Sequence, residues 1–552
     1  MNVWQDSAPS SRLAFLGAWA RKALPIAAVL FVATLLGAAT GLGLGILIAL
    51  LVVMVAVAAL MLWDYRVGVV TLVLIMPVSN TYLFPRQLFG ITGFSPENLI
   101  LLGTAGVYFL KQLFSQGGPL KVSPKFYWFY VLPFVLAGFL GTLYVRSIYP
   151  GYLIDNQIKY SAPPAYLRDV VLKPLFFLLY AYLVAAAVRD SKSPQKFLIP
   201  YTLSLLLMVL VVFYGALSSG LGLSGLADST NRQALNVVGM HANELGPMLV
   251  TGVVFIMFMQ AGLERPLARM ACWAVIAVAG VAVMLTFSRA AFLALVIASG
   301  FYFFGAKNGV RLLIGLMVVS LVVMVIPQEV VDRVTEGFQP GAADVQSMSK
   351  TDKLTAGRVA GIWIPVLGDI AHSPLIGRGL MSMLWSNASW SGLTPHLITH
   401  PHNAYLRALM DMGVLGLGLV HFGVFSLWRY VRQASQQDAH PAWLRAAARG
   451  VGIMLMVYAV IGVTGSSWMP IPMQILAWGA LGIVLGALAK APSLESEAVV
   501  QAGLVACRQA QAYGHGVLRC AIGPVLGDGD VAGYRADVDD APASLVLHGR
   551  EG

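Results

Sequence analysis

Residues 399–406 read Thr399-His400-Pro401-His402-Asn403-Ala404-Tyr405-Leu406, and here a long polar segment gives way to an apolar helix. Two histidines and an asparagine thus stand where a membrane protein can contact water and lipid together. Pro401 fixes the local backbone and disfavours helix before it, and Asn403 is a preferred N-cap residue for the helix that follows. We expect the rest of the chain to be organised around this junction.

The helix after the junction carries a polar stripe, because Asn403, Arg407 and Asp411 are spaced i, i+4 and i+8. We expect Arg407 and Asp411 to pair, since charges inside a membrane generally need partners. Small residues let helices approach closely, so another helix is expected against the glycines at positions 413, 416 and 418.

The composition of the whole chain indicates a membrane protein. Of its 552 residues, 58% are hydrophobic and only 11% are charged, and the mean hydropathy is +0.76. So few charges cannot cover a soluble surface, so the expected fold class is an all-α polytopic membrane protein. The net charge of +11 fits basic cytoplasmic loops rather than nucleic-acid binding. The three cysteines show no CxxC or paired spacing, so we expect neither a disulfide framework nor a zinc site.

Hydropathy predicts about fourteen spanning helices, since a span needs about 20 apolar residues. With the N-terminus inside, every predicted cytoplasmic turn is basic, which agrees with the positive-inside rule. The predicted spans lie near 23–41, 43–62, 67–85, 97–111, 126–145, 170–188, 197–216, 243–260, 270–287, 290–306, 311–327, 403–427, 450–468 and 471–489.

This count divides the chain into five parts. We expect a cytoplasmic arm at 1–22, helices 1 to 11 in 23–327, a large periplasmic loop at 328–402, helices 12 to 14 in 403–489, and a partly disordered cytoplasmic tail at 490–552. Within the loop, apolar residues recur on one face from Thr355 to Ile370, which predicts an amphipathic helix. Such a helix can lie on the membrane with Trp363 at the interface.

The predicted outer loops are sparsely charged, and Arg232, Arg289, Arg358 and Arg378 lie in or beside them. Arg289 follows Thr286-Phe287-Ser288, which leaves almost no turn between two spans. One interpretation is an anion site, because a guanidinium binds phosphate oxygens in a bidentate way. The alternative, of equal weight from the sequence, is snorkelling to the interface or a salt bridge.

The histidines of the junction are candidates for a general base, because the pKa of an imidazole lies near ambient pH. Capping or interfacial packing is the alternative for either ring taken alone. His241 precedes Asn243 and Glu244 at another predicted helix start and repeats the design. The histidines at 241, 396, 400 and 402 could also suggest a metal, but no carboxylate stands beside them at ligand spacing, so no metal or other cofactor is expected.

Several blocks in order resemble the bacterial O-antigen ligase family, which also includes Wzy-type repeat-unit polymerases and protein O-oligosaccharyltransferases. His402-Asn403, nine residues and then Gly413-Val414-Leu415-Gly416 resembles the family signature. Upstream resemblances are Thr286 to Ala291, Gly357-Arg358 with Trp363, Ser373-Pro374-Leu375-Ile376-Gly377-Arg378-Gly379, and a weaker block with Arg232 and residues 241–246. Together they cover roughly residues 230 to 420. Leu417 stands where the ligase pattern often has a polar residue.

The resemblance implies a GT-C-like membrane enzyme that performs metal-independent, inverting glycosyl transfer on the periplasmic face of the inner membrane. The donor would be a glycan on undecaprenyl diphosphate, and the acceptor a glycan or lipid A-core hydroxyl. By the resemblance, His402 matches the histidine that activates the acceptor, and Arg289 and Arg358 match arginines that hold the diphosphate. Arg232 joins them as a donor-site residue, and His400, Asn403, Arg407, Asp411 and His241 are expected to support the site.

Three functions remain open at this stage. A ligase attaches the glycan to lipid A-core, whereas a polymerase extends an exopolysaccharide or O-antigen. A transporter or flippase for lipid-linked sugars is the alternative from another class, and it predicts charges near mid-membrane in several helices. The spans here are nearly free of charge apart from Arg407 and Asp411, which favours the enzyme.

Overall fold

The computed structural model describes residues 55–82, 84, 95–114, 118–121, 123–155, 157–222, 239–304, 358–392, 398–465 and 467–490. All regular elements in these residues are helical, and they contain no β-strand. Arg232, the predicted spans at 23–41 and 311–327, most of the span at 43–62 and the tail after 490 lie outside them. The chain divides into two compact units, residues 1–72 with 85–115 and residues 73–84 with 116–552.

The first unit is described through the start of α3 (Tyr65–Ser79) and through α4 (Pro96–Phe114). The rings of Tyr65 and Tyr108 lie 5.1 Å apart between centroids, and both side chains are fully buried. Aromatic pairing of this kind holds two apolar helices together beyond the burial of their surface.

The second unit contains the remaining helices, several of which join α-helical turns to π or 3-10 turns without a break. In chain order they are α5 (Pro124–Phe126), η1 (Tyr127–Val131), α6 (Leu132–Gly141), η2 (Val145–Ser147), α7 (Gly151–Ile154), α8 (Pro163–Tyr166), η3 (Leu167–Leu172), α9 (Lys173–Asp190), η4 (Pro194–Phe197), α10 (Leu198–Ser218), α12 (Ala242–Met259), η6 (Gln260–Gly262), α13 (Pro266–Leu285), α14 (Arg289–Phe304), η8 (Val359–Trp363), α18 (Ile364–His372), η9 (Ser382–Trp385), α19 (Asn387–Trp390), α20 (Ala404–Ala434), α21 (Ala442–Gly462) and η10 (Pro472–Gln474), which opens a helix that continues to Lys490.

Seven helices in the described residues are long and apolar enough to cross a membrane, and they indicate an integral membrane protein. They are Pro163–Asp190, Pro194–Ser218, Ala242–Gly262, Pro266–Leu285, Ala404–Ala434, Ala442–Gly462 and Pro472–Lys490. Each matches one of the fourteen predicted spans. Boundaries differ most where charged residues extend a helix beyond its apolar stretch: the helix predicted at 450–468 begins at Ala442, and the one predicted at 403–427 continues to Ala434.

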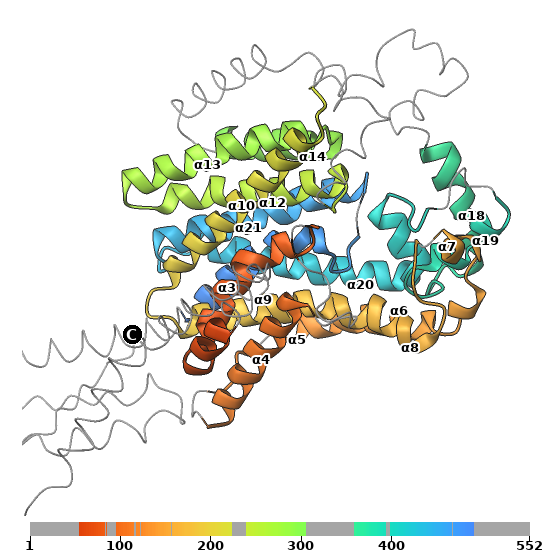
Figure 1. Ribbon diagram of the computed structural model, residues 1–552, viewed down its shortest axis with the longest axis horizontal. Coiled ribbons are helices and arrows are strands. Elements are labelled where there is room, and N and C mark those ends of the chain that lie inside the picture. The colour runs from red at the N-terminus through yellow and green to blue at the C-terminus, as the bar shows by residue number, and fades with distance from the viewer. Residues whose placement is uncertain are drawn as a thin grey trace, which may run out of the picture. The chain divides into compact units, whose positions relative to one another are not determined.

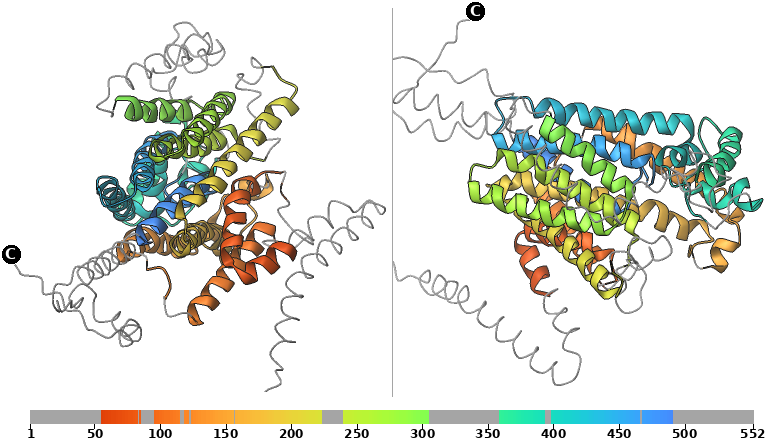
Figure 2. Two further views of the ribbon diagram at one scale, coloured as in Figure 1. Left: turned by 90° about the vertical axis from the view of Figure 1, so that its left-hand side faces the viewer. Right: turned by 90° about the horizontal axis from the view of Figure 1, so that it is seen from above.

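Helix α12 lies at the centre of the second unit, between α10, α13, α14 and α21 (Figures 1 and 2). After Glu244 it carries no charge, and a helix that is apolar on every side is stable only when other helices surround it. Accordingly, 89% of the most apolar 18-residue stretch of Ala242–Gly262 is buried, compared with 22% of the corresponding stretch of α13. The N-cap of this closely packed helix is His241.

The described residues between α14 and α20 form a segment beyond one end of the long helices, where α18 and α19 lie near α7 (Figure 1). We call residues 358–403 the loop segment. Tyr152 of α7 anchors it, because its hydroxyl donates to the Ile398 carbonyl at 2.7 Å and lies 2.9 Å from the Ser389 hydroxyl.

Candidate functional site

The histidine junction, residues 399–403, is an irregular bend that leads into a capped helix. The His400 and His402 rings are 4.3 Å apart between centroids, and the His402 backbone is left-handed with φ of 51°. Asn403 Oδ1 accepts hydrogen bonds from the Tyr405 and Leu406 amides at 2.9 and 3.1 Å, which confirms the predicted N-cap. A left-handed backbone is uncommon for a residue with a side chain, and such strain is often found at functional sites.

The predicted amphipathic helix exists as η8 and α18, and it supports this turn. Trp363 donates its indole N–H to the Pro401 carbonyl at 2.9 Å, so the bond joins the helix to the residue between the two histidines. Val366 is fully buried and packs with Met383 and Met410. Val366 on the apolar face thus packs within the protein, whereas Leu367 on the same face is exposed.

Both imidazoles of the junction are held neutral. Burial, together with the neighbouring Arg358 and His241, lowers the pKa of His402 to about 4. Burial likewise holds the pKa of His400 well below its usual range, with contributions from His402, Arg407 and Arg358. A buried imidazole among cations loses its proton readily, because both desolvation and repulsion disfavour the charged ring. At neutral pH each ring is therefore an unprotonated base.

Arg358 lies at the N-terminal end of η8 and contacts the backbone that follows another helix, α21. Its Nη1 donates to the Thr464 carbonyl, just after α21, at 2.6 Å. An arginine has five N–H donors in a planar fork, so one such bond fixes the guanidinium without consuming its charge. The charge of Arg358 therefore faces the junction from a fixed position.

His241 begins α12 with a reciprocal capping box. Its Nδ1 accepts from the Asn243 amide at 3.1 Å, and Glu244 accepts from the His241 amide at 3.2 Å. The hydrogen bond from Asn243 fixes the tautomer of the His241 ring, because Nδ1 must be unprotonated to accept it. His241 also influences the pKa of His402, which places the start of α12 close to the histidine junction.

Arg289 begins α14 after a strained turn, because Phe287 is left-handed with φ of 46°. The turn packs on α12: a Cβ added at Gly246 would lie 2.9 Å from both Ser288 and Ala291. Arg289 therefore starts its helix beside the first turns of α12, the helix capped by His241. Its side chain is partly buried.

Helix α20 is interrupted at Gly413, whose φ of 64° and ψ of −171° are not helical. Backbone from the loop segment occupies the break: the Arg378 and Gly379 amides donate to the Met410 and Asp411 carbonyls, each at 2.9 Å. In the other direction, the Val414 amide donates to the Pro374 carbonyl at 2.8 Å. The loop thus satisfies the groups that the helix leaves free.

The glycines of these two blocks fit together at the break. A side chain at Gly413 would overlap the backbone of Leu375 and Ile376, and one at Gly377, with φ of 68°, would overlap that of Asp411. The prediction of an approaching helix is therefore wrong for Gly413, which admits a loop instead. An added Cβ at Gly418 meets nothing within 4 Å among the described atoms.

Arg407 and Asp411 pair as predicted, with Arg407 Nε 3.5 Å from Asp411 Oδ2. The carboxylate does more than neutralise the arginine. Its Oδ1 accepts from the Ser382 amide and hydroxyl at 2.9 and 2.7 Å. The pair therefore ties α20 to the loop segment while Arg407 influences His400.

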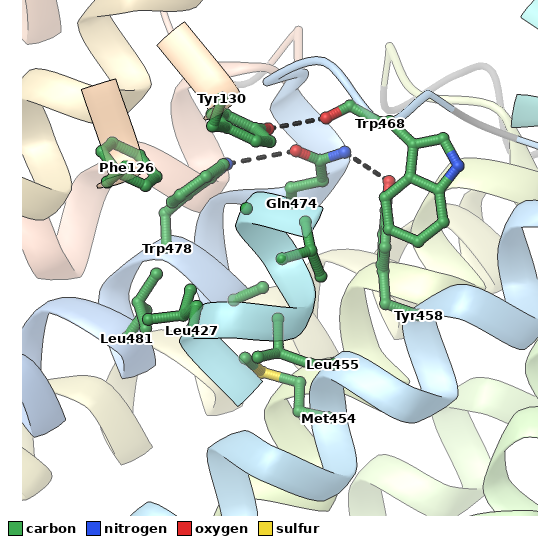
Figure 3. Close-up of a pocket in the computed structure, with 13 residues that line it drawn as sticks. Phe126, Tyr130, Leu427, Met454, Leu455, Tyr458, Trp468, Gln474, Trp478 and Leu481 are labelled. Carbon is green, nitrogen blue, oxygen red and sulfur yellow. Dashed lines mark hydrogen bonds between the residues drawn. The ribbon is translucent and has the colours of Figure 1, made fainter. Parts of the chain in front are cut away.

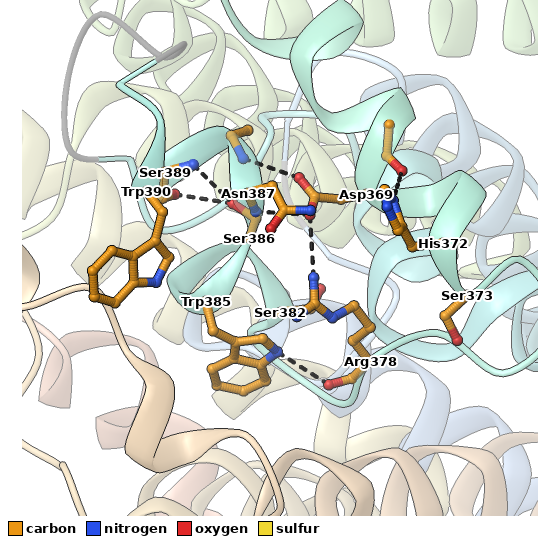
Figure 4. A network of polar contacts seen from close by, with 12 residues as sticks. Asp369, His372, Ser373, Arg378, Ser382, Trp385, Ser386, Asn387, Ser389 and Trp390 are labelled. Atoms are coloured by element: carbon orange, nitrogen blue, oxygen red, sulfur yellow. Dashed lines mark hydrogen bonds and ion pairs between the residues drawn. The ribbon is translucent and has the colours of Figure 1, made fainter.

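A second carboxylate, Asp369, organises the loop segment from within (Figure 4). It accepts from the Asn387 and Ala388 amides at 2.8 and 3.1 Å, and from Arg378 Nη1 at 3.2 Å. Arg378 also lies over the Tyr144 ring, 5.3 Å from its centroid. Arg378 is thus part of a buried ion pair that shapes the segment.

An aromatic cluster continues from α20 into an apolar cavity. The Trp468 ring lies 4.4 Å from His421 and 5.4 Å from Tyr405, between centroids. Trp468 also lines the cavity, where Tyr130 donates to its carbonyl at 2.6 Å (Figure 3). Gln474 bonds to Tyr458 and accepts from the Trp478 indole in the same wall.

Of the residues that the sequence singled out, His241, Arg358 and Arg407 influence the pKa values of the junction histidines, and Asp411 pairs with Arg407. The described members are His241, Arg289, Arg358, His400, His402, Asn403, Arg407 and Asp411, whereas Arg232 and His396 lie outside the described residues. No group of three or more His, Cys, Asp or Glu suited to hold a metal occurs in the described part of the chain. The sequence analysis missed Asp369 and Ser382, whose partners are distant in sequence.

A comparison with protein families finds one match over this region. No curated protein matches the chain as a relative. The matched residues, 273–421, include the Arg289 turn, the loop segment, the histidine junction and the break in α20. Residues 273–421 match the family model described as O-antigen ligase, and this part of the chain lies in a protein with membrane-spanning helices.

Proposed function

We propose that this protein transfers a glycan from undecaprenyl diphosphate to an acceptor hydroxyl at the periplasmic face of the inner membrane, as in O-antigen ligation. The observation that carries the proposal is His402: a partly buried imidazole on a left-handed backbone, neutral with a pKa of about 4, beside Arg358. The family of residues 273–421 supports the substrate class, a lipid-linked glycan.

In the proposed reaction, the unprotonated His402 ring removes the proton of the acceptor hydroxyl as its oxygen attacks the anomeric carbon. The bond between that carbon and the diphosphate oxygen breaks, and undecaprenyl diphosphate leaves. Attack from the face opposite the leaving group inverts the anomeric configuration. A positioned base of this kind contributes about 10²–10⁴-fold to the rate.

The arginines act on the leaving group in this proposal. Negative charge grows on the diphosphate as the glycosidic bond breaks, and fixed cations stabilise it. Arg358 and Arg289, together with Arg232, are assigned this role. Arg358 thus has two effects, since its charge also favours the neutral form of His402.

The test of His402 is transfer by the purified full-length protein with a lipid-linked donor and an acceptor. We expect His402→Ala to lower kcat by about 10²–10⁴-fold while donor binding and thermal stability are kept. His372→Ala is the matched control, because this exposed histidine bonds to the Gly368 carbonyl of its own helix. Retained transfer by His402→Ala would overturn the role of the base.

The same site suits a repeat-unit polymerase, in which the acceptor is a second lipid-linked glycan. The family supports a ligase and a polymerase alike. Deleting the gene distinguishes them: single lipid-linked repeats accumulate if the protein polymerises, and long unattached polymer accumulates if it ligates. An unchanged pool of lipid-linked glycan contradicts both.

A further inference from the structure

A second cavity, of about 460 Å³, lies between α12, α14, α20 and α21. It is formed near the C-terminal end of α20, by residues such as Trp428, Arg432 and Ser435. The histidine junction precedes the other end of this 31-residue helix. At about 1.5 Å per residue, the stretch from Gly413 to Arg432 alone separates the two sites by roughly 28 Å. The cavity is thus distinct from the proposed transferase site.

Two arginines, Arg432 and Arg449, line this cavity without a carboxylate partner among the described residues. The Arg432 guanidinium lies 5.0 Å from the centroid of the Trp428 ring, which fixes its direction. Arg445 of the same helix as Arg449 differs, because it forms an ion pair with Asp438. Two uncompensated cations in one recess favour a bound anion.

The remaining walls are apolar and include Phe258, Phe301, Ile453 and Met456. Gly452 leaves space within them, since an added Cβ would first meet Val431 at 3.8 Å and the Trp428 indole nitrogen at 4.0 Å. A small soluble anion makes no use of such a surface. An amphiphile does, because its chains bury against the walls while its charged group meets the arginines.

The ends of membrane helices are where phospholipid headgroups lie. Trp428 and Tyr302 line the cavity, and tryptophan and tyrosine are enriched at the headgroup level of a bilayer. Basic pockets between membrane helices at this depth suit anionic lipid headgroups. The charge, the apolar walls and the position at the helix ends therefore agree on one class of ligand.

We propose that this cavity binds an anionic phospholipid, with its phosphate at Arg432 and Arg449 and an acyl chain against Phe301 and Met456. Zwitterionic phospholipids bind less well, because their ammonium group is repelled by the same arginines. The site is independent of glycan transfer, so its test does not require the proposed function.

The test measures lipids that stay bound to the purified full-length protein, by native mass spectrometry after incubation with phosphatidylglycerol or phosphatidylcholine of the same acyl chains. We expect phosphatidylglycerol to be retained preferentially. The double variant Arg432→Gln/Arg449→Gln should weaken its retention between about fivefold and thirtyfold, since each cation near an anionic lipid contributes about a factor of five.

Three variants make the result specific. Arg445→Gln removes the same charge at the same end and should change retention by less than about twofold. Arg432→Lys/Arg449→Lys should keep most of it, and Gly452→Phe should block the lipid without changing any charge. Thermal melting reports whether each variant folds, and the lysine variant keeps the proposal testable if the glutamine variant does not.

Two results would overturn the proposal. Equal retention of phosphatidylglycerol and phosphatidylcholine by the unchanged protein would show that the arginines select no headgroup. Displacement of phosphatidylglycerol by millimolar inorganic phosphate would show a site for a soluble anion rather than for a lipid.

Discussion

The loop segment contains two polar regions that differ in how their charged and titratable groups are paired. Around Asp369, each charge has a partner: the carboxylate takes two backbone amides and Arg378. At the histidine junction, two partly buried imidazoles are neutral beside cations, and His402 has a left-handed backbone. Satisfied networks specify a shape, whereas strained residues with displaced pKa values are typical of sites that perform chemistry. The difference distinguishes residues that stabilise the structure of the site from residues that take part in the proposed chemistry.

Among residues that stabilise the structure of the site, we expect the largest effect for Gly413→Ala. Its backbone conformation is accessible mainly to glycine, and a methyl group would overlap the backbone of Leu375 and Ile376. We expect the free energy of unfolding to fall by about 3 kcal/mol or more. Thermal or denaturant unfolding in detergent measures the loss, and transfer activity should fall with it.

Gly418→Ala is the matched control, because it lies in the same helix and an added Cβ meets nothing within 4 Å. Alanine favours helix over glycine, so this variant should be neutral or more stable by about 0.5–1 kcal/mol. Similar losses in both variants would contradict the inserted loop.

Asp369→Ala should have the next largest effect. Removing the carboxylate, which is itself buried, leaves two backbone amides and the Arg378 guanidinium without their acceptor. Breaking a buried, hydrogen-bonded charge costs about 2–4 kcal/mol, and unfolding by denaturant measures it. Asp438→Ala is the control: its side chain is 96% exposed and pairs with Arg445, so the loss should stay below about 1 kcal/mol. Equal losses would show that the Asp369 network is no more important than a surface pair.

Local sequence rules predicted the parts of the site that depend on neighbours in the chain. Asn403 caps α20 and Arg407 pairs with Asp411 because both relationships lie within one turn of helix. Hydropathy located each of the seven spans because burial in lipid requires long apolar runs.

Relationships across long stretches of sequence were not predictable in this way. Gly413 looked like a helix contact, because nothing in its neighbourhood indicates that residues 374–379 insert there. The pairing of Asp369 with Arg378 likewise depends on a chain reversal after α18. The order of the motif blocks linked these residues through the family resemblance, but their geometry required the fold.

The pH dependence of glycan transfer tests the proposed chemical role of His402. With a pKa of about 4, His402 stays neutral at pH 5 and above, so the acid limb of kcat/KM should lie near pH 4 rather than near 6.5. The folded-state pKa is below the unfolded value, so the unfolded chain binds the proton first. The free energy of unfolding should therefore decrease as pH falls from about 6.5 to about 4.

Arg358→Gln sharpens this test, because it removes a cation that disfavours protonation of His402. The acid limb should move toward higher pH by up to about one unit, yet stay below 6.5 because burial is the larger cause. Arg146→Gln, an exposed arginine of η2, should leave the limb in place. If Arg358→Gln raises KM for the donor without moving the limb, the arginine acts on the diphosphate alone, and the low pKa of His402 results from burial.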